Sequence, residues 1–354
     1  MIDFRYHLVS IVAVFLALAI GIVLGSTELQ GTTIDGLRST QNSLKNQLSA
    51  AQSAERSYAS LAGASDAFLQ TAEPKLLADT LAGDRIVLVT EPGAASSVIS
   101  GVKQAATLAR ATVTGTIALQ PKFNDLSGAT ESTLSAINDE LASADGATLG
   151  AAAAVQTVYQ QQAAQLIASA TLDKTAAAAG STTASGLTGS QAQGVLEAYA
   201  QGGYLTTSGT PTDRATLAVL ITPGTAPTDG TNDPADQVLL AVAQEFATAS
   251  AATLAAGSVA GSAPAASAIS VLRSSSVSSQ VSSVDNADTV LGQISTMWAL
   301  ANQRAGGKPN SYGISGASAV SPDVPSPVPS VTPTASGTST QKVTGKAKKI
   351  VEKK

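Results

Sequence analysis

The stretch GDRIVLVTEPG, residues 83–93, decides the fold predicted for this chain. Its centre is a short apolar run rich in β-branched side chains, and a Pro-Gly pair ends it. A strand that is apolar on both faces is typical of a parallel sheet covered by helices. Residues 94–111 then carry apolar side chains at helical spacing, and TVTGTIAL, residues 112–119, has a second strand pattern. This order predicts a βαβ unit.

The same order of patterns recurs after residue 214. ATLAVLITPG, residues 215–224, is a second buried strand that ends in Pro-Gly, and residues 251–258 form another. The helix between them begins with Asp233 as N-cap and a proline at its first position. We therefore predict a three-layer α/β/α domain with a mainly parallel sheet over residues 84–316. Further helices are predicted within residues 127–170, 188–203 and 289–304.

An apolar segment near the start of the chain predicts a membrane anchor. Leu8 to Leu24 contains no charged residue, and twelve of its seventeen residues are Leu, Ile, Val or Phe. A helix of that length rises about 26 Å, close to the ~30 Å hydrocarbon core of a bilayer. We expect an uncleaved transmembrane helix over residues 8–25 that contacts lipid through Leu8 to Leu24. A cleaved signal peptide, cut after Gly25, is the alternative.

The charges beside this segment predict its orientation. Arg5 lies before it, whereas Glu28 and Asp35 follow it and the next basic residue is Arg38. Positive charge favours the cytoplasmic side. Residues 1–7 are therefore expected inside and the main domain outside.

Residues 28–80 have a loose heptad pattern, which predicts a coiled-coil stalk. One core position holds Leu37, Leu44, Ala51, Tyr58, Ser65 and Ala72, and the other holds Ile34, Gln41, Leu48, Glu55, Ala62, Leu69 and Leu76. Pro74 is expected to break the helix or to start a new one. A single amphipathic helix lying on its own domain is the alternative.

Small residues recur every four positions in the apolar segment, at Ala13, Ala17, Gly21 and Gly25. Such a stripe lets helix backbones approach closely in a membrane. Together with the heptads it favours a homo-oligomer, read as a parallel dimer, although an alanine-rich composition explains the stripe equally well.

The end of the chain differs from the rest. Residues 317–341 are rich in Pro, Ser and Thr and predict an extended linker. Residues 342–354 hold six lysines and one glutamate, which suits contact with anionic lipid or a cell-wall polymer. A solvated disordered tail is the alternative. The net charge of −5 leaves the remainder strongly acidic, so no nucleic-acid partner is expected.

Motifs for catalysis, cofactors and metals are missing from the sequence. The chain has no cysteine and one histidine, His7, so no zinc site or Ser-His-Asp triad is available to the main domain. No glycine-rich nucleotide loop follows the leading strands. We predict that the protein is not an enzyme and has no cofactor, catalytic or metal-binding residues. The alternative is a carboxylate site at Glu91 with Asp125 and Asp233, which otherwise have capping or surface roles. Trp298 is expected in a helical core.

The sequence resembles an actinobacterial envelope family named for the mycobacterial copper transport protein B. The resemblance is carried by FRYHLVSIVAVFLALAIGIVLGS, DRIVLVTEPGA, ATVTGTIAL, ATLAVLITPG and VDNADTVLGQISTMWALANQRAGGKPNSYG, in order over roughly residues 1–316. It implies a role in copper homeostasis at the cell envelope and an association with an outer-membrane pore.

The number of side chains able to bind copper limits that role. Copper(I) prefers thiolate, thioether and imidazole ligands, and the chain offers His7, Met1 and Met297 alone. We therefore expect an indirect part in copper efflux, as an anchored oligomer or scaffold. A structural envelope scaffold without a metal role is the alternative.

Overall fold

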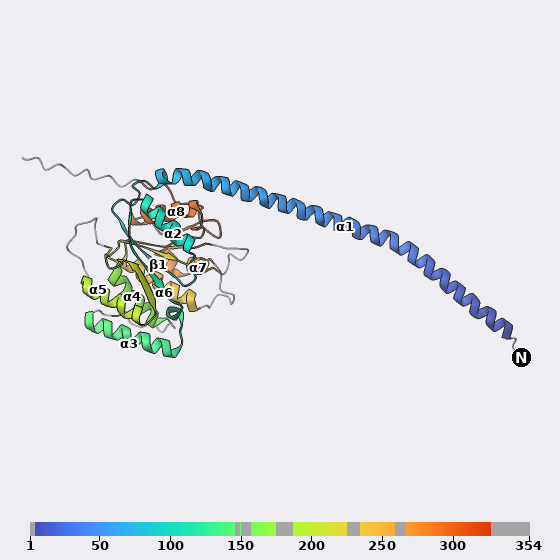
Figure 1. Cartoon of the computed structure of the whole chain (residues 1–354), viewed down its shortest axis with the longest axis horizontal. Helices are drawn as coiled ribbons and strands as arrows, with labels where there is room; N and C mark the ends of the chain where they lie inside the picture. Colours follow the sequence, from blue (N-terminus) through green and yellow to red (C-terminus); the bar gives the residue numbers. More distant parts are fainter. Residues whose placement is uncertain are drawn as a thin grey trace, which may run out of the picture. The chain divides into compact units, whose positions relative to one another are not determined.

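The computed structural model describes residues 4–145, 149, 157–174, 187–224, 234–258 and 267–326. The chain forms two units, of which the first ends at Phe68 and the second begins at Leu69. Figure 1 shows the elements along the chain. Asp233, the Lys-rich segment 342–354 and the Pro/Ser/Thr-rich segment beyond Ser326 lie outside the described residues, so the predictions for them stay predictions.

The described residues of the first unit belong to α1, Phe4–Leu77, whose last residues belong to the second unit. The expected break at Pro74 is wrong, because Pro74 lies inside this helix. A proline removes one hydrogen bond to the carbonyl four residues earlier. Here the helix continues for only three residues beyond it, and the last of these, Leu77, is fully buried. The described residues contain one copy of α1, so the coiled coil stays a prediction.

The second unit contains one mixed sheet. Within the described residues seven strands have the order β3-β2-β1-β4-β5-β6-β7. They are β1 (Arg85–Thr90), β2 (Thr112–Leu119), β3 (Leu205–Gly209), β4 (Leu217–Ile221), β5 (Ala252–Ala256), β6 (Ser282–Val284) and β7 (Ser311–Tyr312). Every neighbouring pair is parallel except β2 and β3. The predicted mainly parallel sheet is therefore confirmed.

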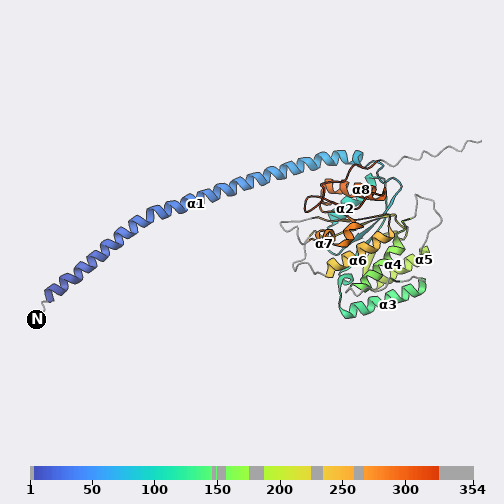
Figure 2. The same cartoon turned by 180° about the vertical axis from the view of Figure 1, so that it is seen from behind.

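Helices cover both faces of the sheet, as predicted. They are α2 (Ser96–Leu108), α3 (Gly128–Asp145), α4 (Val158–Thr171), α5 (Gly189–Gln201), α6 (Pro234–Ala249), α7 (Ala268–Ser274) and α8 (Val290–Arg304), with short 3₁₀ turns η1 (Pro121–Asn124) and η3 (Ser276–Ser279). Figures 1 and 2 show α2 and α8 on one side of the sheet and α4, α5 and α6 on the other, with α3 outside them. The apolar core divides into the same two clusters.

Buried hydrogen bonds join α3 to the helices beneath it. The Tyr199 hydroxyl on α5 donates to Asn138 Oδ1 over 2.7 Å, and Asn138 Nδ2 donates to the Tyr159 carbonyl over 2.9 Å. Asn138 and Tyr199 are fully buried. Because buried polar groups are costly when unpaired, this chain of bonds fixes the relative positions of α3, α4 and α5.

The end of α1 is part of the core. Leu77 and Leu81 are fully buried, and the Trp298 indole on α8 donates from Nε1 to the Leu76 carbonyl over 3.0 Å. The last carbonyls of a helix have no partner within the helix. Trp298 is 8% exposed, which confirms its predicted place in a helical core. The sequence could not show that its polar edge caps α1.

Two helical glycines provide a test of the packing around α8. A Cβ at Gly292 would lie 1.9 Å from the Asn286 carbonyl oxygen, whereas one at Gly194 on α5 would have no atom within 4 Å. Gly292→Ala should therefore destabilise the fold by about 2 kcal/mol. Gly194→Ala should stabilise it by about 0.8 kcal/mol, the helix-propensity gain. Denaturant unfolding followed through Trp298, the single tryptophan, measures both. Equal effects of the two substitutions would contradict the packing described for α8.

Candidate functional site

The apolar segment of α1 is a candidate membrane span. By length and composition, Arg5–Gly25 is one helix able to cross a bilayer, and none of it is buried against the described chain. Its large side chains are between 53% and 76% exposed, which in water would be unfavourable. A Cβ at Gly21 or Gly25 would meet no atom within 4 Å, so the small-residue stripe is open. Lipid or another helix would satisfy these surfaces.

The order of the strands places a potential ligand site between β1 and β4. From β1 the chain proceeds to β2 and β3 on one side, whereas β4 to β7 lie on the other. In open α/β sheets, ligands bind at the carboxyl ends of the strands where the order changes direction. Glu91 follows β1 at this point and Thr222 follows β4. The structure therefore places Glu91 at the topological switch point.

Two Pro-Gly loops meet at this position. Gly93 has a φ of 85°, and a Cβ built on it would lie 3.6 Å from Pro223 Cβ. The Glu91 amide donates to the Ile221 carbonyl over 2.9 Å, and the Thr222 amide donates to the Ala256 carbonyl over 2.9 Å. Glu91 and Thr222 are both buried. The loops thus extend the sheet hydrogen bonding and pack on each other, and they do not form a glycine-rich phosphate cradle.

Asp125 has a local role. Its Oδ1 accepts the Ser127 amide over 2.9 Å, and its Oδ2 accepts the hydroxyls of Ser127 over 2.9 Å and Thr130 over 2.6 Å. The Thr130 hydrogen bond is the largest cause that lowers the pKa of Asp125, followed by the bonds from Ser127. These bonds shape the turn that leads into α3. Asp125 thus has a local role in this turn.

A site built from several metal-binding side chains is not found in the described parts of the chain. They contain no group of three or more His, Cys, Asp or Glu residues able to hold one ion. Asp233, the third carboxylate of the predicted alternative, lies outside them. Met297 is fully buried in the core of the second unit, and His7 lies on α1.

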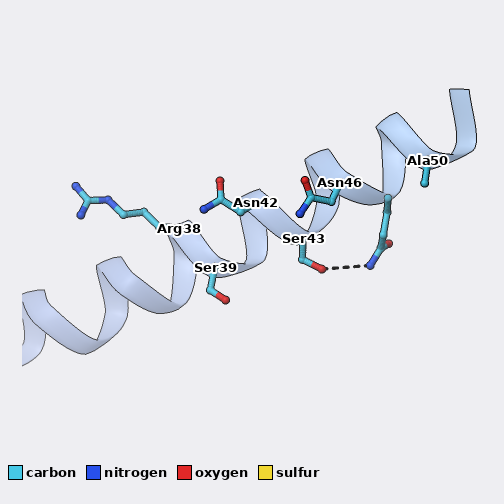
Figure 3. A pocket seen from close by; sticks show the side chains of 7 residues that line it. Arg38, Ser39, Asn42, Ser43, Asn46 and Ala50 are labelled. Atoms are coloured by element: carbon cyan, nitrogen blue, oxygen red, sulfur yellow. Dashed lines mark hydrogen bonds between the residues drawn. The ribbon is translucent and has the colours of Figure 1, made fainter. Parts of the chain in front are cut away.

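The hollows on the described surface include three that are open to solvent. One of about 800 Å³ runs beside Arg38 to Ala50, but every residue that lines it belongs to α1 (Figure 3). A second, of about 590 Å³, lies between α3 and α5, and a third, of about 290 Å³, lies between α5 and the β3 edge. The single-walled hollow on α1 cannot enclose a ligand.

The most elaborate polar cluster is one that sequence reasoning missed. Asp285, fully buried after β6, pairs with Arg273 of α7 over 2.8 Å. Its carboxylate also accepts the amides of Ile314 and Ser315, each over 2.8 Å. Arg273 donates further to Ser283 Oγ over 2.9 Å and to the Tyr312 and Ser315 carbonyls over 2.7 and 2.5 Å.

This cluster holds the chain that follows β7. Gly313 has a φ of 130°, and a Cβ there would lie 1.8 Å from Asp285 Oδ1, so only glycine lets the turn approach the carboxylate. The sequence signal was present, because Asp285 and Gly313 both belong to the segment VDNADT…NSYG. Their separation by 28 positions hid the contact. The role is structural, since every oxygen of Asp285 is used within the fold.

The family described as "Copper transport outer membrane protein, MctB" matches residues 1–322. The Copper transporter MctB of Mycobacterium tuberculosis H37Rv is 31% identical over 318 residues, which cover 88% of this chain and 96% of that protein. The Copper transporter MctB of Mycobacterium leprae is 30% identical over 319 residues, covering 89% and 96%.

This chain belongs to the MctB family. The match includes the candidate span, the remainder of α1 and the whole described sheet, so it concerns the architecture and not one motif. The family resemblance seen in the sequence is thereby confirmed.

A test of the buried cluster compares two aspartates that each pair with an arginine. Asp285→Asn leaves the Arg273 guanidinium buried without its counter-ion, which should cost about 3–5 kcal/mol of unfolding free energy. Asp79→Asn removes the partner of the exposed Arg110, 2.6 Å away, and should leave stability near wild type. Asp79 has a φ of 60°, which asparagine tolerates. Equal losses in urea unfolding would contradict the assigned role of Asp285.

A second test concerns Glu73, on the buried face of the last turns of α1. It is 2% exposed, its Oε1 has no hydrogen-bond partner, and burial raises its pKa. A carboxyl whose pKa is higher in the folded protein than in the unfolded chain binds its proton more tightly in the folded state. The free energy of unfolding therefore falls as the pH rises from the pKa of the unfolded chain through the pKa of the folded protein. Glu73→Gln should therefore stabilise the protein at pH 8 and not at pH 4. The unfolding free energy at both pH values checks this, and a pH-independent difference would contradict it.

Proposed function

We propose that this protein is a membrane-anchored component of copper transport that contributes to copper efflux indirectly, as an oligomer or scaffold. The observation that carries the proposal is the family match over residues 1–322, which spans both the anchor and the α/β unit. The relatives bear the name Copper transporter MctB.

The indirect role is inferred from the side chains of this protein that could bind copper(I). Copper(I) favours thiolate, thioether and imidazole. The chain has no cysteine, and its described soft ligands are a fully buried Met297 and His7, which belong to different units. A high-affinity site made by one described chain is not supported. Copper would then be cargo that passes an assembly to which this protein contributes its anchor and its domain.

The membrane part of the proposal follows from α1. Leu8 to Leu24 contact the bilayer, residues 1–7 lie on the cytoplasmic side, and the α/β unit lies outside. The charge asymmetry between Arg5 and Glu28 supports this orientation. The family description names an outer-membrane protein, which supports the outer membrane as the alternative location. The Lys-rich segment 342–354 would contact anionic lipid or a cell-wall polymer.

We propose no catalytic step. Glu91 is buried at the end of β1 beside a Pro-Gly loop, and the hydrogen bonds of Asp125 serve the turn before α3. A second candidate function is a structural envelope scaffold without a metal role, which is favoured by the approach of the two Pro-Gly loops at the switch point between β1 and β4.

Deletion of the gene separates the two functions. The copper proposal expects cell-associated copper to rise several-fold and copper tolerance to fall, both restored by the wild-type gene. A variant with Leu16→Lys and Ile20→Lys should not restore them, because each charge at the centre of a span costs about 3 kcal/mol. The matched control, Leu16→Ile with Ile20→Leu, should restore them fully. Unchanged copper content and tolerance, together with altered envelope permeability, would favour the scaffold and contradict the copper role.

A further inference from the structure

One face of the first unit carries large apolar side chains that are exposed to solvent. Leu37, Leu44, Leu48, Tyr58, Leu61 and Phe68 on α1 are between 59% and 74% exposed. The opposite face holds Ser39, Asn46, Ser53 and Ser60. Figure 3 shows the polar side chains of part of α1, with Ser39, Asn42 and Asn46 projecting from the helix. The helix is therefore amphipathic, and its apolar face has no cover within its own unit.

The apolar face follows a heptad seam that shifts once. From Leu44 the spacing of four and three leads through Leu48 to Ala51, as in a regular heptad. The next seam residue, Ala54, again comes three residues later, after which the spacing alternates between four and three residues as before. The remaining seam positions after Ala54 are Tyr58, Leu61, Ser65 and Phe68. Two successive steps of three are a known discontinuity that locally overwinds a coiled coil.

The shift changes which residues form the core of the stalk. An unbroken heptad would place Glu55, Ala62 and Leu69 at core positions. In the structure Leu69 begins the second unit and packs on its core, whereas Phe68 is 72% exposed. Adjacent residues project about 100° apart on a helix. Leu69, which packs on the core of the second unit, and Phe68, the last seam position, therefore lie on different faces of α1. Glu55 falls beside the seam and not within it.

We propose that two copies of this chain pair in parallel along the shifted seam from Leu37 to Phe68. The inference rests on the proposed membrane anchoring for its direction. α1 begins in the candidate span Arg5–Gly25, so two anchored copies start at the same height and run the same way. The seam from Leu44 to Phe68 contains no charged side chain, so two identical seams do not repel. A second copy therefore fits this face better than a charged or extended partner.

The test uses single cysteines in a chain that has none of its own. The full-length protein, in its native membrane, is oxidised mildly and analysed by non-reducing electrophoresis. Leu48→Cys and Leu61→Cys should give a covalent dimer in high yield. Ser53→Cys, on the polar face, should give at least about fivefold less, because a disulfide requires Cα atoms within about 7 Å. The discriminating control is Ala62→Cys, which the shifted seam places outside the core and the unbroken heptad places inside it.

Monomer at both Leu48→Cys and Leu61→Cys would overturn the pairing. A yield at Ala62→Cys equal to or above that at Leu61→Cys would overturn the shift. To exclude chance collisions in the membrane, Leu44→Glu is added to the Leu48→Cys protein and should abolish its dimer, whereas Ser53→Glu should not. A dimer that survives Leu44→Glu would overturn the seam. Copper content plays no part in these readouts, so failure of the copper role and failure of the pairing are distinguishable.

Discussion

The hydrogen bond from the Trp298 indole to the Leu76 carbonyl marks the constraint on which the second unit depends. A helix that enters a folded domain must end there, and its last carbonyls lose their water as they do so. Trp298 satisfies one of them, while Leu77 and Leu81 fill the layer beneath. Glu73 lies in the same buried turns, and its Oε1 has no hydrogen-bond partner. Apolar packing and the hydrogen bonds from Trp298 and Thr80 to the carbonyls of Leu76 and Leu77 therefore hold the end of α1, and burial raises the pKa of Glu73.

The sequence predicted the parts of this fold that rest on local patterns. β1 and β4 contain continuous apolar runs, and composition alone marks the candidate span of α1. The mainly parallel direction was predicted from βαβ order, whereas the antiparallel pairing of β3 with β2 follows from no local pattern. Pro74 was misread since a proline near a helix end and a proline that breaks a helix have the same sequence signature.

The missed features share a different cause. Asp285 and Arg273 are only twelve positions apart, yet the turn they hold comes 28 or more positions after Asp285, beyond any local pattern. The sequence alone could not separate the predicted heptad from the proposed shifted seam, because Leu69 and Phe68 are equally apolar. Only the structure shows that Leu69 packs against the core of the second unit. Of the candidate site, Glu91 was correctly placed at a strand end, but the packing of the two Pro-Gly loops could not be foreseen from spacing.

Membership of a family named for copper transport is compatible with the lack of cysteine if the protein has a structural part in transport and does not itself coordinate copper. Selective affinity for copper(I) requires soft ligands held in a fixed geometry. In the described residues, the polar groups with a fixed geometry are those of the Asp285 cluster, the Asn138 hydrogen bonds and the Trp298 hydrogen bond. All of these stabilise the α/β unit. The surfaces left unsatisfied are the lipid-length span and the apolar seam of α1. Both surfaces could be covered by lipid or by another helix of the same kind, and neither surface requires a metal ion. The rigid contacts of the described residues therefore lie in the α/β unit, and the unsatisfied apolar surface lies on α1.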